Sequence, residues 1–278
     1  MSIKDIIVHL PPEAVSRPTG SIAYAINMAD QLSAHVTALV FTFDFIKPAT
    51  FYGGATDEDI AEARENFHRA AEEATATFSV YAARAGISYE TAIEETLADD
   101  APQIMNDYAK LRDLVICGNE QTGLLDGKAI GEYVLFASGR PVIVVPPSYD
   151  RPFACDRILV AWDYSRPAAR AAADALPLLK MAKQVFVVTV TNDKDIKSSR
   201  TGVELARHFS RHGVEVTFED VPRNSNSIDN TLLAHATARH VDLIVMGGYG
   251  HSQLREFVLG GATRGMLDNA DRPVIFSH

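Results

Sequence analysis

The sequence predicts an α/β protein made of two tandem domains, each built around a doubly wound parallel sheet. Three observations predict this fold class: short motifs recur in both halves, strand-like and helix-like segments alternate, and the strand-like segments are continuously apolar. The chain has 278 residues, 47% of them hydrophobic, which is enough for two cores. We expect the domains at residues 1–147 (the first copy) and 154–278 (the second copy), joined by a proline-rich stretch at Pro146–Pro152.

Four sequence anchors recur in the same order in the two copies. Ile6, Gly86, Asp113 and Arg140 correspond to Ile158, Gly213, Asp242 and Arg272, each within a run of similar residues. The offset between the copies falls from 152 residues at the first anchor to 127 at the second. The first copy therefore carries some two dozen extra residues, which we expect between Phe45 and Ala63, where proline and glycine interrupt the pattern.

In the first copy the elements begin with a short buried strand at Ile6–His9 and an apolar-periodic helix at Ser21–Leu32. Val36–Phe43 is rich in β-branched and aromatic residues, as strands are. Asp59–Arg84 predicts a long amphipathic helix, because its apolar residues recur near every 3.6 positions. The remaining elements are strands at 87–94, 113–117 and 141–145 and a helix at 101–111.

The second copy repeats this order of strands and helices. Its strands are continuous apolar runs, which is typical of parallel strands covered on both faces. Strands alternating with helices predict a doubly wound sheet in each half. We expect strands at 157–161, 184–190, 214–221, 242–246 and 273–276, and helices at 166–182, 200–212, 228–240 and 260–269.

Charge and composition exclude several classes of function. The chain has 36 acidic and 26 basic side chains, a net charge of −10, which argues against a general nucleic-acid binder and against docking on anionic membranes. No apolar run approaches the roughly 18 residues of a membrane helix, and Pro11 comes too early for a signal-peptide core. Only Cys117 and Cys155 are present, so we expect neither a disulfide framework nor a cysteine zinc site. These observations predict a soluble, cytoplasmic protein.

Ligands of an open parallel sheet bind beyond the carboxyl ends of the strands, where the strand order reverses. In the second copy, the first such place is Ala161–Ser165, directly after the first strand. Asp163 in this segment can accept hydrogen bonds from ribose hydroxyls or from a base edge. The alternative is that the segment only starts a helix, with Ser165 as the cap and Pro167 in the first turn.

Glycines mark the second place, after the strand at 242–246. Glycines that follow a strand let backbone N–H groups turn toward an anion, and a helix start adds unpaired N–H groups and the positive end of its dipole. Two such nests can wrap a di- or triphosphate, although a tight turn explains any one of these glycines taken alone. The glycines are Gly247, Gly248 and Gly250 after the strand, and Gly260 and Gly261 where the next helix begins.

At these residues the sequence resembles a tandem member of the universal stress protein family. The nucleotide signature of that family is Gly, two residues, Gly, nine residues, Gly, then Ser or Thr, and Gly247, Gly250 and Gly260 match its spacing. Asp163 matches the acidic residue that the family places after its first strand. The resemblance covers nearly all of the second copy and, more weakly, the first.

The resemblance implies Rossmann-like domains of the adenine-nucleotide alpha-hydrolase type and a role in stress response. It implies that the second copy binds ATP or a related adenine nucleotide, with Asp163 on the ribose or base, glycine N–H groups on the phosphates, and Val190 and Met246 beside the adenine. Mg²⁺ could bridge the phosphates, although no cluster of metal ligands is evident. The expected binding residues are Ala161, Asp163, Val190, Met246, Gly247, Gly250, Gly260, Gly261, Ala262 and Thr263.

Members of the family pair through their last strands. The resemblance therefore implies that strands 141–145 and 273–276 join the two copies as an internal pseudo-dimer, while a homodimer of the whole chain stays open.

Two departures from the family pattern affect the expected site. Gly261 replaces the Ser or Thr whose hydroxyl would touch phosphate, a loss of roughly 0.5–1.5 kcal/mol that Thr263 could offset. In the first copy Pro11 stands where Asp163 stands, and Gly118-Asn119-Glu120-Gln121 replaces the glycine segment. Glu120 would repel phosphate, so we interpret the first copy as degenerate. Residues 1–150 also carry 10 basic and 22 acidic side chains, against 16 and 14 in residues 151–278, and the near-neutral half suits a polyphosphate better.

Other motifs point to no dedicated catalyst. A P-loop, a dinucleotide-binding glycine motif after the first strand and a nucleophile elbow are all missing from the sequence. His208 and His212 lack a ligand set, while His251, Arg255 and Arg264 could contact phosphate or simply lie at the surface. We therefore expect a nucleotide-binding protein; the alternatives are a nucleotide-independent interaction scaffold and a slow ATPase.

Overall fold

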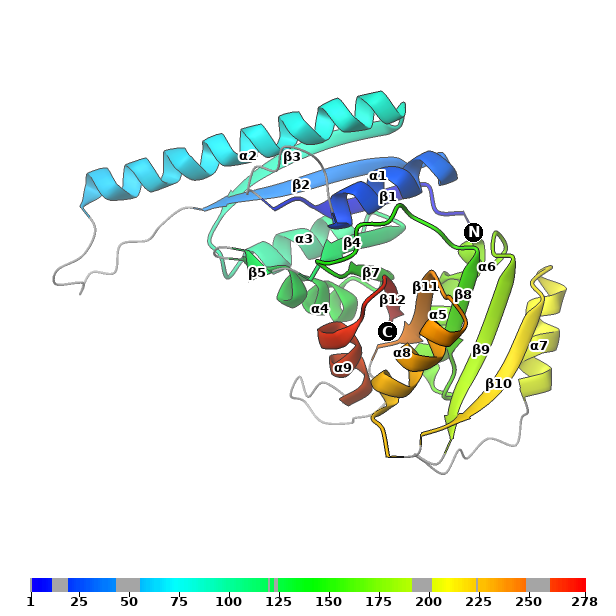
Figure 1. The fold of residues 1–278 in the computed structure, drawn as a ribbon. Helices are drawn as coiled ribbons and strands as arrows, with labels where there is room; N and C mark the ends of the chain where they lie inside the picture. Colours follow the sequence, from blue (N-terminus) through cyan, green and yellow to red (C-terminus); the bar gives the residue numbers. More distant parts are fainter. Residues whose placement is uncertain are drawn as a thin grey trace.

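The structure, a computed structural model, describes residues 2–11, 20–43, 56–119, 121–122, 125–191, 202–223, 225–248 and 261–278. Ten strands form one sheet with helices on both faces, and β5 (Gln121–Thr122) and β6 (Leu125–Asp126) form a separate pair (Figure 1). The ten strands are β1 (Asp5–His9), β2 (His35–Phe43), β3 (Ser88–Thr96), β4 (Leu114–Gly118), β7 (Val142–Val145), β8 (Arg157–Ala161), β9 (Gln184–Thr191), β10 (Val216–Pro222), β11 (Leu243–Gly247) and β12 (Val274–Ser277). The helices are α1 (Gly20–Leu32), α2 (Asp57–Ala85), α3 (Ala101–Ala109), α4 (Gly127–Ala137), α5 (Arg166–Asp174), α6 (Leu176–Leu179), α7 (Gly202–Arg211), α8 (Ile228–Ala238) and α9 (Gly261–Asn269).

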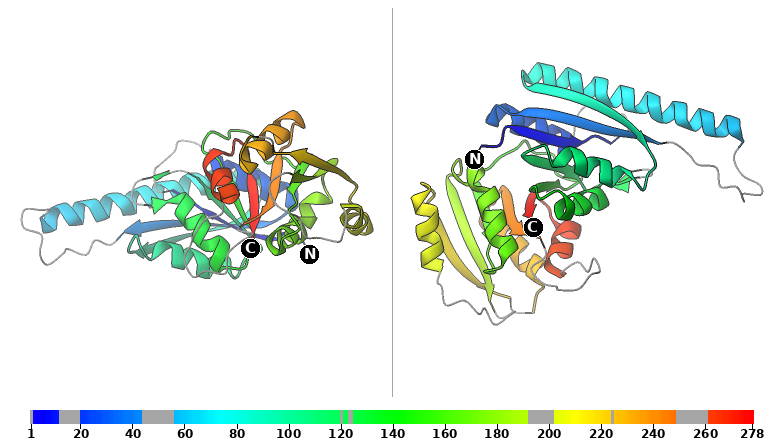
Figure 2. Two further views of the ribbon diagram at one scale, coloured as in Figure 1. Left: turned by 90° about the horizontal axis from the view of Figure 1, so that it is seen from below. Right: turned by 180° about the vertical axis from the view of Figure 1, so that it is seen from behind.

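The large sheet is symmetric about its centre. Its order is β10-β9-β8-β11-β12-β7-β4-β1-β2-β3, so each copy runs outward as fifth, fourth, first, second and third strand. The central pair β7 and β12 is antiparallel, with Ile143 opposite Ile275, whereas the strands within each copy pair in parallel. The pairing of last strands that the resemblance implied is therefore present, and it places the copies at opposite ends of one sheet (Figure 2).

The predicted strands and helices are present in the predicted order. The bounds of every predicted strand agree with the structure to within two residues. α2 begins after Thr56, whose hydroxyl accepts the amide of Asp59 at 3.1 Å, and it ends at Gly86, which has φ of 70°. These are the polar cap and the left-handed glycine that commonly bound a helix. Because α2 has 29 residues and α7 has 10, much of the extra length of the first copy lies in this helix.

The structure differs from the prediction at two helices. α4 was not predicted, because it begins at Gly127 and holds Gly131, residues that weaken a helical pattern. The predicted helix 166–182 is instead two helices, α5 and α6, which meet at Ala175. Pro177 lies at the start of α6, and a proline cannot donate the amide hydrogen bond that a continuous helix requires.

The segment between the copies packs against the first copy at Tyr149 and Phe153. Phe153 is 2% exposed, its ring lies 5.3 Å from that of Tyr24, and its carbonyl accepts the side-chain amide of Gln31 at 2.9 Å. Tyr149 also packs edge-on against Tyr24. The buried residues on each face of the sheet form one cluster that includes side chains of both copies. Residues 147–152 are exposed apart from the half-buried Tyr149, so the core contact comes from Phe153, directly after the proline-rich stretch.

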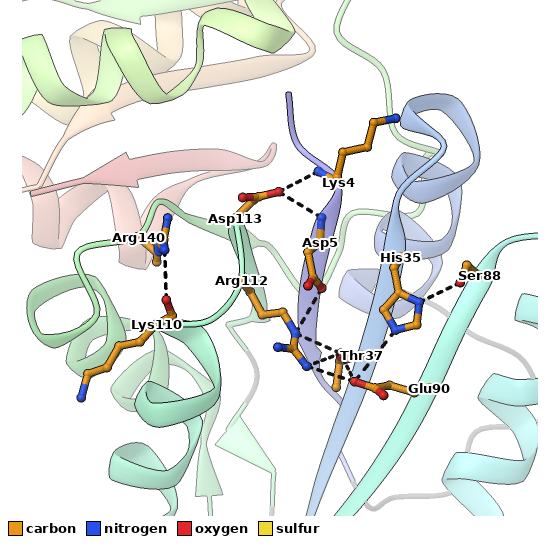
Figure 3. A network of polar contacts seen from close by, with 10 residues as sticks. All are labelled: Lys4, Asp5, His35, Thr37, Ser88, Glu90, Lys110, Arg112, Asp113 and Arg140. Carbon is orange, nitrogen blue, oxygen red and sulfur yellow. Dashed lines mark hydrogen bonds and ion pairs between the residues drawn. The ribbon is translucent and has the colours of Figure 1, made fainter. Parts of the chain in front are cut away.

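Two of the repeated anchors act at the amino ends of the strands. Asp113 Oδ2 accepts the backbone amides of Lys4 at 2.8 Å and Asp5 at 3.1 Å (Figure 3). In the second copy, Asp242 Oδ2 accepts the amide of Arg157 at 2.9 Å. Each aspartate thus ties the start of the fourth strand to the start of the first, which explains why it recurs.

The repeated arginines have a similar role. Arg140 donates to the carbonyl of Lys110 at 3.0 Å (Figure 3), and Arg272 donates to the carbonyl of Val241 at 2.8 Å. Both guanidinium groups hold the backbone just before the fourth strand, beside the proline that opens the fifth. Hydrogen bonds from a charged donor to a carbonyl are among the stronger ones in proteins.

Candidate functional site

The turn after β8 presents Asp163 at the carboxyl edge of the sheet. Asp163 is exposed, and its Oδ1 accepts the amide of Ser165 at 3.0 Å. Ser165 in turn caps α5 by accepting the amide of Ala168 at 3.2 Å, with Pro167 in the first turn. The cap interpretation is thus confirmed for Ser165. Asp163 shapes the same turn, and its exposed carboxylate can still bind a ligand.

The chain between these two side chains adopts an uncommon conformation. Tyr164 has φ of 62°, the left-handed region that residues with a side chain rarely occupy. Its ring lies 5.8 Å from that of Trp162 in an edge-on contact. Left-handed residues that are not glycine cluster at functional sites, where the surrounding structure holds them in place.

Three of the predicted residues form one apolar surface at this edge. Ala161 ends β8, Val190 lies near the end of β9, and Met246 lies near the end of β11. All three belong to the cluster on one face of the sheet; Met246 is 6% exposed and the other two are partly exposed. The structure therefore places Val190 and Met246, the two side chains expected beside an adenine, on the same face of the sheet as Ala161.

Gly247 joins the two parts of the site. A Cβ added at Gly247 would lie 2.5 Å from the amide nitrogen of Ala168 and 2.6 Å from the carbonyl carbon of Pro167. Because backbone atoms lie so close, only glycine fits at the end of β11. The sequence analysis explained this glycine by phosphate binding alone and did not predict that packing also requires it. The contact also brings the glycine segment against the first turn of α5, beside Ser165 and Asp163.

The start of α9 completes the described part of the site. Among the described residues, no neighbouring side chain or backbone lies within 4 Å of a Cβ added at Gly261, which is exposed, and Ala262 is partly exposed. Thr263 is 3% exposed, whereas position 261 is exposed. The Thr263 side chain therefore lies in a different environment from the hydroxyl that a Ser or Thr would bring to position 261. Arg264 lies 3.8 Å from Asp268 on the same helix. Of the other predicted residues, Gly250, His251, Arg255 and Gly260 lie outside the described residues.

The sequence analysis missed one carboxylate that supports α9. Asp229 in α8 is 4% exposed and accepts the side-chain amide of Asn269 at 3.2 Å. A Cβ added at Gly265 would lie 2.4 Å from the carboxyl carbon of Asp229, so α8 and α9 pack closely there. The sequence gives no sign of this role, because acidic residues are common in the first turn of a helix and the partner helix lies over 30 residues further along the chain.

In the first copy, larger side chains occupy two of the three corresponding positions, and Cys117 stands where Met246 stands. His9 is the last residue of β1, as Ala161 is the last residue of β8. Phe41 lies two residues after the residue of β2 that pairs with His9, and Val190 lies two residues after the residue of β9 that pairs with Ala161. His9 is 3% exposed and Phe41 is fully buried, with their rings 5.8 Å apart. Burial lowers the pKa of His9 to about 4, and its Nε2 has no hydrogen-bond partner among the described residues. Side chains therefore fill the place where the second copy has a partly exposed wall.

The helix start in the first copy is also closed by an acid. Asp126 caps α4, and its Oδ1 accepts the amide of Lys128 at 2.9 Å. A carboxylate on the first amides of a helix takes the position that a phosphate would use. Glu120, the other acid expected to repel phosphate, lies outside the described residues.

The described part of the chain contains neither a group of three or more residues able to hold a metal ion nor a helix long and apolar enough to cross a membrane.

The comparisons with known proteins agree with this architecture. The model described as "Universal stress protein family" matches residues 155–278. A universal stress protein from Archaeoglobus fulgidus has the same fold with a TM-score of 0.71 at 19% identity, covering 98% of this chain and 95% of its own. A candidate universal stress protein from Pseudomonas aeruginosa gives a TM-score of 0.59 at 15% identity, covering 99% of this chain and 93% of its own. No curated protein sequence matches the chain.

Proposed function

We propose, on the premise that residues 155–278 belong to the universal stress protein family, that the second copy binds ATP or a related adenine nucleotide. The nucleotide lies across the carboxyl edge of β8 and β11. Asp163 accepts hydrogen bonds from the ribose or the base, and Ala161, Val190 and Met246 form the apolar side of the adenine site.

One observation carries this proposal. Asp163 and Gly247 are 84 positions apart in the sequence. The structure nevertheless links them through Ser165 and Ala168, because Ser165 bonds to both Asp163 and Ala168, and Ala168 touches Gly247. β8 and β11 are the neighbouring strands at which the sheet order reverses, the place where doubly wound sheets bind ligands. A ligand with a polar end for Asp163 and an anionic end for the glycine segment fits this edge.

We assign binding rather than dedicated catalysis to this site, and a role in stress response within the cytoplasm. The Asp163 carboxylate accepts the Ser165 amide, and the Ser165 hydroxyl accepts the Ala168 amide, so both groups serve the turn that opens α5. Mg²⁺, where it takes part, would be held by the phosphates more than by protein ligands. A slow ATPase ranks below binding for the same reason.

We further interpret the β7–β12 pair as an internal pseudo-dimer of the two copies. In this arrangement the first copy contributes structure rather than a second nucleotide site, because His9, Phe41 and Asp126 occupy the positions a nucleotide would need.

A nucleotide-independent interaction scaffold is the second candidate. It is favoured by Gly261, which brings no hydroxyl to the helix start, and by the filled edge of the first copy. Under this alternative the second copy keeps the fold of a nucleotide-binding domain without the ligand.

Two measurements on the whole chain separate these candidates. Mass spectrometry of small molecules released from the purified protein would identify a retained nucleotide, and calorimetric titration with ATP would give its affinity. We expect Asp163→Ala to weaken ATP binding at least tenfold, a loss of about 1.4 kcal/mol. Asp163→Asn keeps an acceptor for the Ser165 amide, so it tests the carboxylate charge separately from the turn. Unchanged affinity in both variants, or an unmodified chain that binds no nucleotide, would contradict the proposal.

A further inference from the structure

The first copy contacts the second copy at two places that flank residues 249–260: at Gly248 and at the last turn of α9. At the first place, a Cβ added at Gly248 would lie 2.8 Å from Leu135 Cδ2, so the Gly248 backbone lies directly against α4. The carbonyl of Gly248 is 3.0 Å from Nδ1 of His278, and the ring of His278 packs edge-on against Phe136. This place thus rests on two neighbouring side chains of the first copy.

The second place is the last turn of α9, which is held by polar side chains of the first copy. The side-chain amide of Asn119 donates to the carbonyl of Leu267, and Lys128 forms an ion pair with Asp268. Lys128 lies in the first turn of α4, which lies beside α9 in Figure 1. On its other side, α9 packs on Asp229 of its own copy. The helix is therefore clamped between the two copies.

These contacts are equivalent under the symmetry of the sheet. Asn119 follows β4, and Gly248 follows β11. The backbone amide of Asn119 donates to the carbonyl of Val145, the last residue of β7, at 3.2 Å. The amide of Gly248 donates in the same way to Ser277, the last residue of β12, at 2.8 Å. Leu135 and Leu267 stand at matching distances before the repeated arginine anchors. Each residue after a fourth strand thus touches the corresponding leucine of the other copy. In the second copy the contact is a glycine backbone; in the first it is an asparagine side chain.

We propose that Asn119, Lys128 and Leu135 of the first copy are positioning residues that set the affinity of the second copy for the phosphate end of a nucleotide. This inference rests on the proposed function. Asn119, which corresponds to Gly248, bonds to the last turn of α9, the helix whose amino end the proposed function places at the phosphates. Preorganised backbone N–H groups bind an anion more tightly, because less ordering is required on binding.

The proposal predicts a change that depends on the ligand. The contacts of Leu135, Asn119 and Lys128, here called the clamp, act on Gly248 and α9. The adenine and ribose instead meet Asp163, Val190 and Met246 in the proposed function. Loss of one clamp contact should therefore weaken ATP binding about five- to tenfold and adenosine binding less than twofold. A residue that merely supports the fold would weaken both ligands equally.

The test compares Asn119→Ala and Lys128→Ala in the whole chain by calorimetric titration with ATP and with adenosine. Lys110→Ala is the matched control, since Lys110 pairs with Asp107 on α3 and is remote from α9. The exchange of charges in Lys128→Asp with Asp268→Lys tests the ion pair, and it should recover ATP affinity that Lys128→Asp alone loses. Thermal unfolding of each variant confirms that the fold is intact.

Selective loss of ATP affinity, with recovery by the charge exchange, supports the proposal. If the Asn119 and Lys128 variants bind ATP as tightly as the parent chain does, the positioning role is wrong, while the proposal that the second copy binds a nucleotide is unaffected. A parent chain that binds neither ATP nor adenosine overturns both. An equal loss for ATP and adenosine assigns these residues to folding and overturns the positioning role.

Discussion

The two copies keep the same contacts at the amino ends of their strands and differ at the carboxyl ends. Asp113 and Asp242 bond to the start of a first strand, and Arg140 and Arg272 hold the carbonyl before a fourth strand. At the other edge, the second copy has partly exposed apolar residues and glycines, while the first has His9 and Phe41 packed together.

The contacts shared by both copies are those that the fold requires, and the residues that differ between the copies lie at the edge where the proposed function places a ligand. The amino-end contacts connect strands that are distant in sequence, so both copies need them to form the same sheet. The carboxyl edge is constrained by folding only where chains pack closely, as at Gly247. Under the proposed function the first copy binds no nucleotide, so its carboxyl edge is free to fill with large side chains that add buried apolar area.

The largest expected effect tests whether Gly247 is a folding glycine. Gly247→Ala forces a Cβ against the backbone of Pro167 and Ala168, and we expect a loss of about 3 kcal/mol in the free energy of unfolding. Gly261→Ala is the matched change, because no described residue packs against a Cβ at that position, and it should leave stability unchanged or raise it by up to about 1 kcal/mol. Urea unfolding measures both. Equal stabilities would show that Gly247 is not closely packed.

A second prediction concerns the filled edge of the first copy. Since the pKa of His9 falls from 6.5 to about 4 in the fold, the unfolded chain takes up its proton first as the pH drops. The stability that His9 contributes is complete above pH 6.5 and is lost as the pH falls toward 4, by about 3 kcal/mol. His9→Leu should remove this part of the acid sensitivity. Unfolding free energies at pH 8, 6 and 4.5 test it, with His212→Gln, at an exposed histidine, as the control. Parallel pH profiles for His9→Leu and the parent would contradict the prediction.

The smallest effect compares the repeated arginines. Arg272 donates to the carbonyl of Val241 and to the hydroxyl of Thr237, both at 2.8 Å, whereas Arg140 makes one such bond to Lys110. We expect Arg272→Ala to cost about 2 kcal/mol and Arg140→Ala about 1 kcal/mol. Thermal unfolding of both variants gives the ratio. A larger loss from Arg140→Ala would break the equivalence of the two anchors.

The sequence predicts the order of the strands and helices well, because apolar periodicity and the repeat are local signals. It fails at α4, where two glycines hide a helix that tertiary packing stabilises. It also cannot show that Phe153 packs on Tyr24, or that Asp229 supports α9, since these contacts join distant segments. For the site, it identifies Asp163 and Gly247 separately; only the fold shows that they are neighbours.

The stoichiometry of nucleotide binding tests the central claim most directly. Calorimetric titration of the intact chain with ATP should give one nucleotide per chain, and Asp163→Ala should abolish or strongly weaken that single event. Two nucleotides per chain, or one that Asp163→Ala leaves unchanged, would contradict the account in which only the second copy binds.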